Sequence, residues 1–153
     1  MKKALSAILL AAALMALCAC SSEPEPVELT TDNIEDYLAF SFDYSDVERQ
    51  TKIGISFGYT DLSLDCYAVA SGSFTDASVT VEIPLTNGWS VSSSDKSYNP
   101  DASETLVCSF RLPATGSYSE THDLIAAIAY SDPDVQNIAY TITEVSGTFT
   151  PYK

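Results

Sequence analysis

Leu62-Ser63-Leu64-Asp65-Cys66-Tyr67-Ala68 decides the fold class of this 153-residue chain. A residue of apolar type stands at every second position of the stretch. Successive side chains of a β-strand point to opposite faces, so Leu62, Leu64, Cys66 and Ala68 share one face. Strict alternation of this kind predicts a strand that is buried on one side and exposed to water on the other.

The same period of two recurs on both sides of this stretch, in short runs separated by Gly, Pro, Asn, Asp and Ser. Many short alternating runs are typical of an all-β domain, and this number in one domain favours two packed antiparallel sheets. We therefore expect an all-β sandwich of about 7–8 strands over residues 31–153, which begins with a short helical turn at 32–37. The further runs cover residues 38–44, 53–59, 79–85, 89–91, 106–112, 124–130 and 138–142.

Two segments leave alternatives open. Residues 124–130 are apolar throughout and would suit a helix, but their short length and Pro133 favour a strand buried on both sides. Asn87-Gly88 is a strong hairpin signal, yet a tight hairpin there would place Trp89 on the face opposite Ile83. We expect the chain to cross between the sheets near Asn87, which would bury Trp89; the alternative is an exposed Trp89.

The N-terminus has the features of an export signal. Met1-Lys2-Lys3 is positively charged, residues 4–17 are almost entirely apolar, and the run is too short for a membrane-spanning helix. Leu17-Cys18-Ala19-Cys20 resembles the lipobox of bacterial lipoproteins. The resemblance implies removal of residues 1–19, a lipid on Cys20 and a flexible tether over residues 20–30. The alternative is ordinary cleavage after Ala19, with Cys20 left as a free thiol.

The resemblance also implies a location. Two acyl chains of a diacylglycerol suffice for stable anchoring, so Cys20 would hold the protein on the extracytoplasmic face of the cell membrane. In a Gram-negative cell, the outer membrane is the corresponding expectation.

Charge and cysteine content narrow the function. Loss of Lys2 and Lys3 with the signal leaves five Lys/Arg against 21 Asp/Glu, a formal charge of −16. This argues against a nucleic-acid partner, because phosphate binding needs clustered Lys and Arg. Cys66 and Cys108 both lie on apolar faces, and in an oxidising compartment we expect them to form a disulfide. The alternative is two separate buried thiols.

Inward-facing cysteines with a tryptophan between them resemble the immunoglobulin-like sandwich, although only loosely. Trp89 follows Cys66 by 23 residues, further than in antibody domains, and Leu106 stands where those domains carry a tyrosine. The domain also resembles small uncharacterised surface lipoproteins, on Leu29-Thr30-Thr31-Asp32-Asn33-Ile34 before Tyr37-Leu38. That resemblance implies no particular activity.

No catalytic constellation stands out, and we expect no enzyme. His122 is the only histidine, which is too few for a predicted zinc site, and we expect it to be a polar residue at a strand start. No nucleophile-elbow motif accompanies it. Calcium is the one cofactor with a candidate, a weak one, in the oxygen-rich loop that carries Asp132, Asp134 and Asn137.

Aromatic residues provide the remaining candidate site. Trp89, Tyr98 and Tyr118 lie near predicted loops or strand ends, where exposed rings bind sugars or proteins. The leading expectation is a lipid-anchored module that binds a protein or a glycan. The alternatives are a structural or assembly component of the cell envelope and, less favoured, a small hydrolase.

Overall fold

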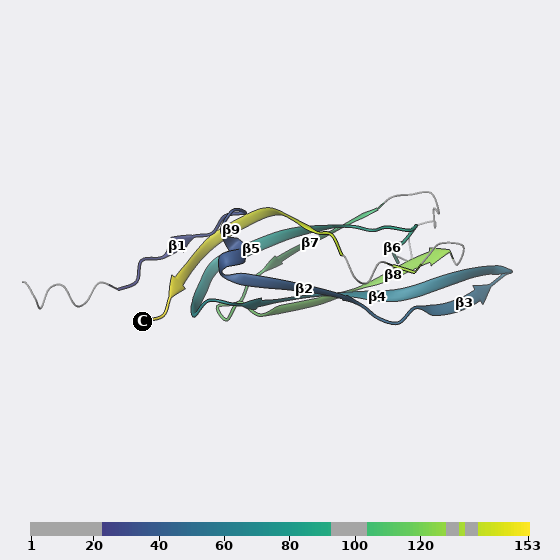
Figure 1. Cartoon of the computed structure of the whole chain (residues 1–153), viewed down its shortest axis with the longest axis horizontal. Coiled ribbons are helices and arrows are strands. Elements are labelled where there is room, and N and C mark those ends of the chain that lie inside the picture. Colours follow the sequence, from purple (N-terminus) through teal and green to yellow (C-terminus); the bar gives the residue numbers. More distant parts are fainter. Residues whose placement is uncertain (1–22, 93–103, 128–131, 134–137) are drawn as a thin grey trace, which may run out of the picture.

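Two antiparallel sheets pack face to face in the computed structural model, which describes residues 23–92, 104–127, 132–133 and 138–153. Sheet A has the order β1-β9-β5-β7, and sheet B has the order β2-β4-β8-β6, with β3 paired to β4 (Figure 1). The predicted all-β sandwich is confirmed. Sheet A contains β1 (Val27–Glu28), β5 (Gly72–Pro84), β7 (Thr105–Arg111) and β9 (Thr141–Pro151); sheet B contains β2 (Leu38–Tyr44), β3 (Glu48–Lys52), β4 (Ile55–Ala68), β6 (Ser90–Val91) and β8 (Tyr118–Ala127).

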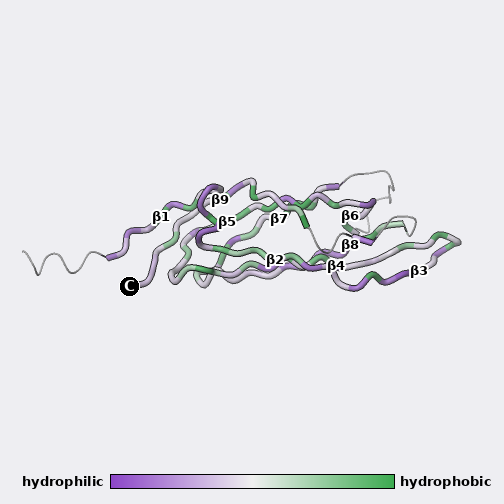
Figure 2. The backbone as a smooth tube through the Cα atoms, viewed as in Figure 1, coloured by the Kyte–Doolittle hydropathy of each residue, from purple (hydrophilic) through white to green (hydrophobic). Residues whose placement is uncertain are grey.

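The core lies between the sheets, where the predicted inward faces meet. Leu62, Leu64 and Cys66 of β4 are buried, as expected from their alternation. From sheet A, β5 and β7 contribute apolar residues at every second position. Figure 2 shows the resulting alternation of hydrophobic and hydrophilic segments along the strands. The buried residues of these two strands are Phe74, Ala77, Val79, Val81, Ile83, Leu106, Cys108 and Phe110, and Leu85 and Leu112 directly after the strands are buried as well.

Strand β4 is longer than the sequence predicted. The separate runs 53–59 and 62–70 form one strand, Ile55–Ala68. Thr60 lies between the two runs; it is buried on the inner face, and its hydroxyl donates to the carbonyl of Ser45 at 2.7 Å. A buried hydroxyl with a partner is tolerated within a sheet, so the polar residue does not end the strand.

Three other strands, β3, β8 and β9, differ from the expectation. β3 was not predicted, because Glu48–Lys52 is fully exposed and has no apolar face. β8 begins at Tyr118, ahead of the apolar run at 124, and β9 begins at Thr141. The expected helical turn is present as the 3-10 turn η1 (Ile34–Asp36). No helix in the described ranges has the length and apolarity needed to cross a membrane.

The crossover near Asn87 is confirmed. β5 pairs with β7 and β9 in sheet A, whereas β6 pairs with β8 in sheet B. Trp89 is 3% exposed and belongs to the core. A Cβ at Gly58 of β4 would approach the Trp89 ring to 3.2 Å, so the absence of a side chain at Gly58 makes room for the indole.

The N-terminal boundary of the domain needs a correction. Residues 20–30 were expected to form a flexible tether, but Val27 pairs with Phe149 and Glu28 with Thr148. Leu29 is buried in the core. The folded domain therefore begins by Val27, and Cys20, the predicted position of the lipid, lies outside the described residues.

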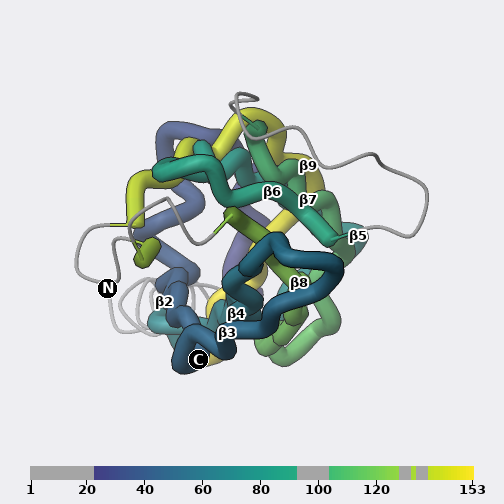
Figure 3. The backbone as a smooth tube through the Cα atoms, turned by 90° about the vertical axis from the view of Figure 1, so that its right-hand side faces the viewer, coloured from purple at the N-terminus to yellow at the C-terminus, as the bar shows by residue number. Residues whose placement is uncertain are grey.

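The sandwich is elongated, and its two ends are distinct. β1 and the C-terminus lie at one end, and the β3–β4 hairpin forms the opposite tip (Figure 1). Figure 3 looks onto the tip end, with β3, β4 and β8 on one side and β5, β7 and β9 on the other. We call the end with β1 the proximal end and the end with the β3–β4 hairpin the distal end.

Candidate functional site

A polar stripe interrupts the apolar interior along β8. Tyr118, Glu120 and His122 have the same parity as the buried Leu124 and Ala126, so all five side chains face sheet A. The first three are partly buried. Sheet interiors rarely hold three successive inward polar groups without a reason, because each must keep a hydrogen-bonding partner.

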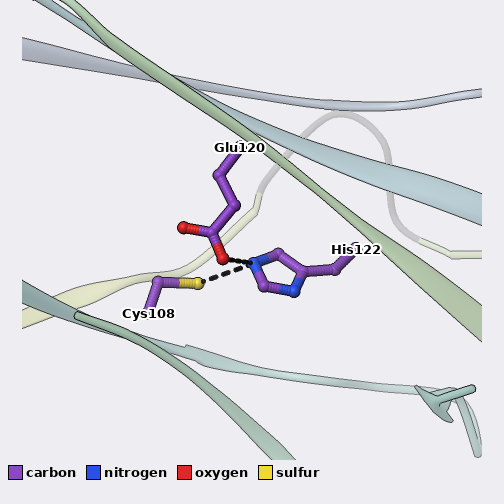
Figure 4. A group of neighbouring side chains, drawn as sticks. All are labelled: Cys108, Glu120 and His122. Atoms are coloured by element: carbon purple, nitrogen blue, oxygen red, sulfur yellow. Dashed lines mark hydrogen bonds and ion pairs between the residues drawn. The ribbon is translucent and has the colours of Figure 1, made fainter. Parts of the chain in front are cut away.

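Cys108 of β7 completes the group from the facing sheet. The Sγ of Cys108 lies 3.3 Å from Nε2 of His122, and Oε1 of Glu120 lies 2.6 Å from the same nitrogen (Figure 4). One ligand atom from each side chain lies within 4.8 Å of the other two. We call Cys108, Glu120 and His122 the edge cluster.

Tyr118 fixes the carboxylate of the edge cluster. Its hydroxyl donates to Oε2 of Glu120 at 2.6 Å, which leaves Oε1 directed at His122. The Tyr118 ring is stacked on Phe110, with centroids 4.1 Å apart and an interplanar angle of 5°. Ring stacking and the hydrogen bond together orient the Glu120 side chain.

Strand pairing explains why the edge cluster reaches solvent. β7 is the last strand of sheet A, and β6 pairs with β8 only at Leu124 and Ile125. Among the described residues, the cluster therefore lies between the edge strand of one sheet and a stretch of the other that has no strand paired along its second edge, and we call this the open side of the sandwich. The side chains of His122 and Glu120 are 18% and 27% exposed.

The electrostatics of the edge cluster do not favour a nucleophilic thiol. Burial, helped by the nearby Glu120 carboxylate, raises the pKa of Cys108 to about 11, so the thiol is protonated at neutral pH. The hydrogen bond to Glu120, followed by burial, raises the pKa of Tyr118 to about 12. In a nucleophile–histidine–acid relay, the two partners contact different ring nitrogens; here Sγ and Oε1 both approach Nε2.

The structure changes the expectation for the two cysteines. Cys66 and Cys108 are free and buried, in β4 and β7 respectively. Desolvation raises the pKa of Cys66 to about 11 as well. This arrangement corresponds to two separate buried thiols, and not to the expected disulfide.

The structure describes two of the three aromatic residues that were predicted to face a ligand, and both face the interior. Trp89 is a core residue, which corrects that prediction. Tyr118 faces the interior and orients Glu120. Tyr98 lies outside the described residues.

Asp132 of the predicted calcium loop has another partner. Its carboxylate accepts a hydrogen bond from Arg49 of β3 at 2.5 Å and forms an ion pair with it. A guanidinium that occupies the carboxylate competes directly with a bound cation. Asp134 and Asn137 lie outside the described residues, so the calcium site stays a prediction with one of its ligands already engaged.

Sequence reasoning did not find the edge cluster. His122 was interpreted as a polar residue at a strand start, and Glu120 was not singled out. The signal was available in the parity of β8: extending the apolar positions 126 and 124 backwards by twos reaches 122, 120 and 118. The proximity of Cys108 depended on which strand of sheet A faces β8, which no local pattern determines.

A second candidate lies on the outer face of sheet B at the distal end. Odd-numbered residues of β4 and β8 point away from the core there, and register places Phe57 beside Ala127 and Tyr59 beside Ile125. Ile55 is 56% exposed. We call Ile53, Ile55, Phe57, Tyr59 and Ile125 the distal patch. Figure 2 shows hydrophobic colouring at the tip of the β3–β4 hairpin.

Ile53 is the most unusual member of the distal patch. It is fully exposed, at 102% of its reference area, at the tip of the β3–β4 hairpin. Its φ of +54° lies in the left-handed region, which β-branched residues strongly disfavour. Strained conformations of this kind cost about 1–3 kcal/mol and concentrate at functional sites.

Comparison with known proteins finds no relative: no protein-family model, no curated protein and no solved structure matches this chain. The fold and the two candidate sites define the molecule as an all-β sandwich with a polar cluster on its open side and an apolar distal tip.

Proposed function

We propose that this protein is a lipid-anchored extracytoplasmic module that binds a partner protein through the distal patch. The observation that carries the proposal is Ile53, an apolar side chain held fully exposed in a strained backbone conformation at the tip of the β3–β4 hairpin. Natural chains usually place Asn, Asp or Gly at such a turn. An exposed Ile in that position is costly for stability, and binding would explain its presence.

The proposed anchor supports this assignment through its position. Cys20 precedes the first described residue by three positions, and β1, which follows, lies at the proximal end. A lipid on Cys20 would therefore hold the proximal end near the membrane and leave the distal patch facing outward (Figure 1). This orientation is the one that an outward-facing binding module requires.

The chemistry of the distal patch favours a protein over a glycan. Glycans are bound mainly by exposed aromatic faces, whereas the most exposed members here are Ile53 and Ile55. Apolar surface of this kind is typical of the centre of a protein interface. We infer that the partner presents an apolar surface.

The positive charge beside the distal patch indicates a second property of the partner. Lys52 of β3, one of the five Lys and Arg in residues 20–153, pairs with Ile55 and so borders the patch in an otherwise acidic chain. The Lys52 ammonium also lies 5.3 Å from the centre of the Tyr59 ring. We infer that the partner places a carboxylate opposite Lys52, beside its apolar surface, because electrostatic complementarity guides association.

The sandwich itself supports the class of module but not its family. Trp89 packs between the sheets that carry Cys66 and Cys108, and we infer from this a loosely immunoglobulin-like relationship. Sandwiches of this architecture carry many unrelated functions, so the proposal rests on the distal patch.

Site-specific photo-crosslinking in intact cells tests the proposal. A photo-reactive residue replaces Ile55 in the full-length protein, and the matched control carries it at Val69. These positions are 56% and 53% exposed. Ile55 is the first residue of β4, and Val69 directly follows its last residue at the opposite end of the strand. We expect a discrete protein adduct from position 55 and none from position 69. Because interface hot spots contribute more than 1 kcal/mol, Ile53→Asn should lower the adduct yield by roughly 5–30-fold.

Two outcomes would overturn the proposal. Equal adducts from positions 55 and 69, or an adduct that Ile53→Asn leaves unchanged, would show that the distal patch does not bind a partner. In the same cells, Cys20→Ser should move the protein from the membrane fraction to the soluble fraction, and retention in the membrane would contradict the lipid anchor.

A further inference from the structure

The edge cluster combines three donor types that transition-metal sites use. Cys108 offers sulfur, His122 nitrogen and Glu120 oxygen, and these atoms lie within 4.8 Å of one another. Calcium and magnesium take oxygen ligands almost alone, whereas thiolate, imidazole and carboxylate together are typical of zinc. We propose that Cys108, Glu120 and His122 form a zinc site on the open side of the sandwich.

The geometry needs only a small adjustment to hold the ion. Zinc bonds of about 2.0–2.3 Å in a tetrahedral site place neighbouring ligand atoms roughly 3.3–3.7 Å apart. The Sγ–Nε2 distance of 3.3 Å already lies in this range, and the Nε2–Oε1 distance of 2.6 Å would lengthen as the ion replaces the direct contact. Glu120 and His122 are two positions apart on one strand, so both reach the site from a single rigid element.

The charges of the site balance. The ion replaces the Cys108 thiol proton and any proton shared between His122 and Glu120, and these protons leave to solvent. Thiolate, carboxylate and neutral imidazole then carry two negative charges, which neutralise one Zn²⁺. Three protein ligands leave a fourth position for water, and the partial exposure of Glu120 and His122 gives that water and the ion a route to the site.

Tyr118 does not reach the ion itself but orients Glu120, one of the three proposed ligands. Its hydroxyl binds Oε2 of Glu120 at 2.6 Å, and its ring is held against Phe110. Groups that orient a metal ligand in this way typically change affinity by about 10–100-fold when they are removed. The support of Glu120 by Tyr118 distinguishes a built site from three polar groups that happen to meet.

Metal titration of the full chain, purified in detergent with its thiols reduced, tests the site. We expect one equivalent of Zn²⁺ in competition with a chromophoric chelator, and a thiolate-to-metal charge-transfer band when Co²⁺ is used instead. Cys108→Ser should abolish the band, and Cys66→Ser is the matched control because Cys66 is also buried and free. His122→Gln and Glu120→Gln should weaken zinc by at least about 10-fold, and Tyr118→Phe by about 10-fold.

Circular dichroism of each variant separates loss of the site from loss of the fold, and the partly exposed Glu120 and His122 supply variants that leave the core intact. The proposal is wrong if folded protein binds no zinc, or if Cys108→Ser retains the cobalt band. Isolation of the protein with a Cys66–Cys108 disulfide would equally overturn it, because that bond consumes the sulfur ligand.

Discussion

The chain makes nearly the same turn twice and uses it for two purposes. Ile53 and Gly54 have φ values of +54° and +76°, and Asn87 and Gly88 have φ values of +57° and +75°. The first turn joins β3 to β4 in a hairpin, where Lys52 pairs with Ile55. The second takes the chain from sheet A to sheet B, with the amide of Trp89 donating to the carbonyl of Thr86 at 3.1 Å.

The difference shows that turn geometry alone does not create a hairpin. After Ile53-Gly54, the chain turns back beside β3 as β4, because residues Ile55–Tyr59 pair with β3 in register. After Asn87-Gly88, Trp89 enters the core and β6 pairs with β8 instead. Burial of the indole therefore decides the route at the second turn. The residue types also differ: Asn suits the left-handed conformation, and Ile does not.

Removing the indole should have the largest effect on the second turn. Trp89→Ala deletes a buried aromatic side chain that packs against Gly58, and such changes cost about 3–5 kcal/mol of unfolding free energy. Urea denaturation followed by circular dichroism measures the loss. At the first turn, Ile55→Ala should stay within about 0.5 kcal/mol, because Ile55 is mostly exposed. A loss below about 1 kcal/mol for Trp89→Ala would show that burial of the indole does not hold the crossover.

Placing isoleucine in the second turn should have a smaller effect. Asn87→Ile puts a β-branched residue at a φ of +57° and removes the hydrogen bond that the Asn87 amide donates to the carbonyl of Asp132. The left-handed conformation costs about 1–2 kcal/mol for such a residue, so we expect a loss of about 2 kcal/mol. Asn87→Gly is the control, because glycine adopts this φ freely. Equal stabilities for the two variants would mean that the turn carries no strain.

Period-two alternation predicted most of the fold because it depends on each strand alone. It placed the inward faces of β2, β5 and β7 correctly, and the conflict between Asn87-Gly88 and Trp89 predicted the crossover. It failed where tertiary contacts replace the local pattern. β3 is stabilised by pairing with β4 and has no apolar face of its own. Thr60 can be buried because the Ser45 carbonyl accepts a hydrogen bond from its hydroxyl.

The candidate sites were less predictable for the same reason. Tyr118, Glu120 and His122 could be grouped by parity, but Cys108 joins them only because the edge strand β7 faces the first half of β8. Ile53 was predicted only as part of the alternating run 53–59; its exposure follows from the hairpin that β3 makes possible. Both sites depend on strand neighbours that are distant in sequence or carry no apolar signal.

The reciprocal change at the first turn should have the smallest effect and the opposite sign. Ile53→Asn gives this turn the Asn-Gly pair of the second, relieves the left-handed Ile and buries no new group. We expect a gain of about 1 kcal/mol in unfolding free energy, the lower end of the range for such strain. Thermal denaturation of the full chain measures it, with Ile53→Val as the control that keeps the β-branched strain.

The sign of this change links stability to the proposed function. A variant that folds more tightly and yet loses its crosslinked partner would show that Ile53 is kept for binding at a cost to the fold, as stability–function trade-offs predict. A destabilising Ile53→Asn would mean that the isoleucine supports the β3–β4 hairpin itself. In that case the strain argument for the distal patch fails, and the two turns differ only in the route that the chain takes after them.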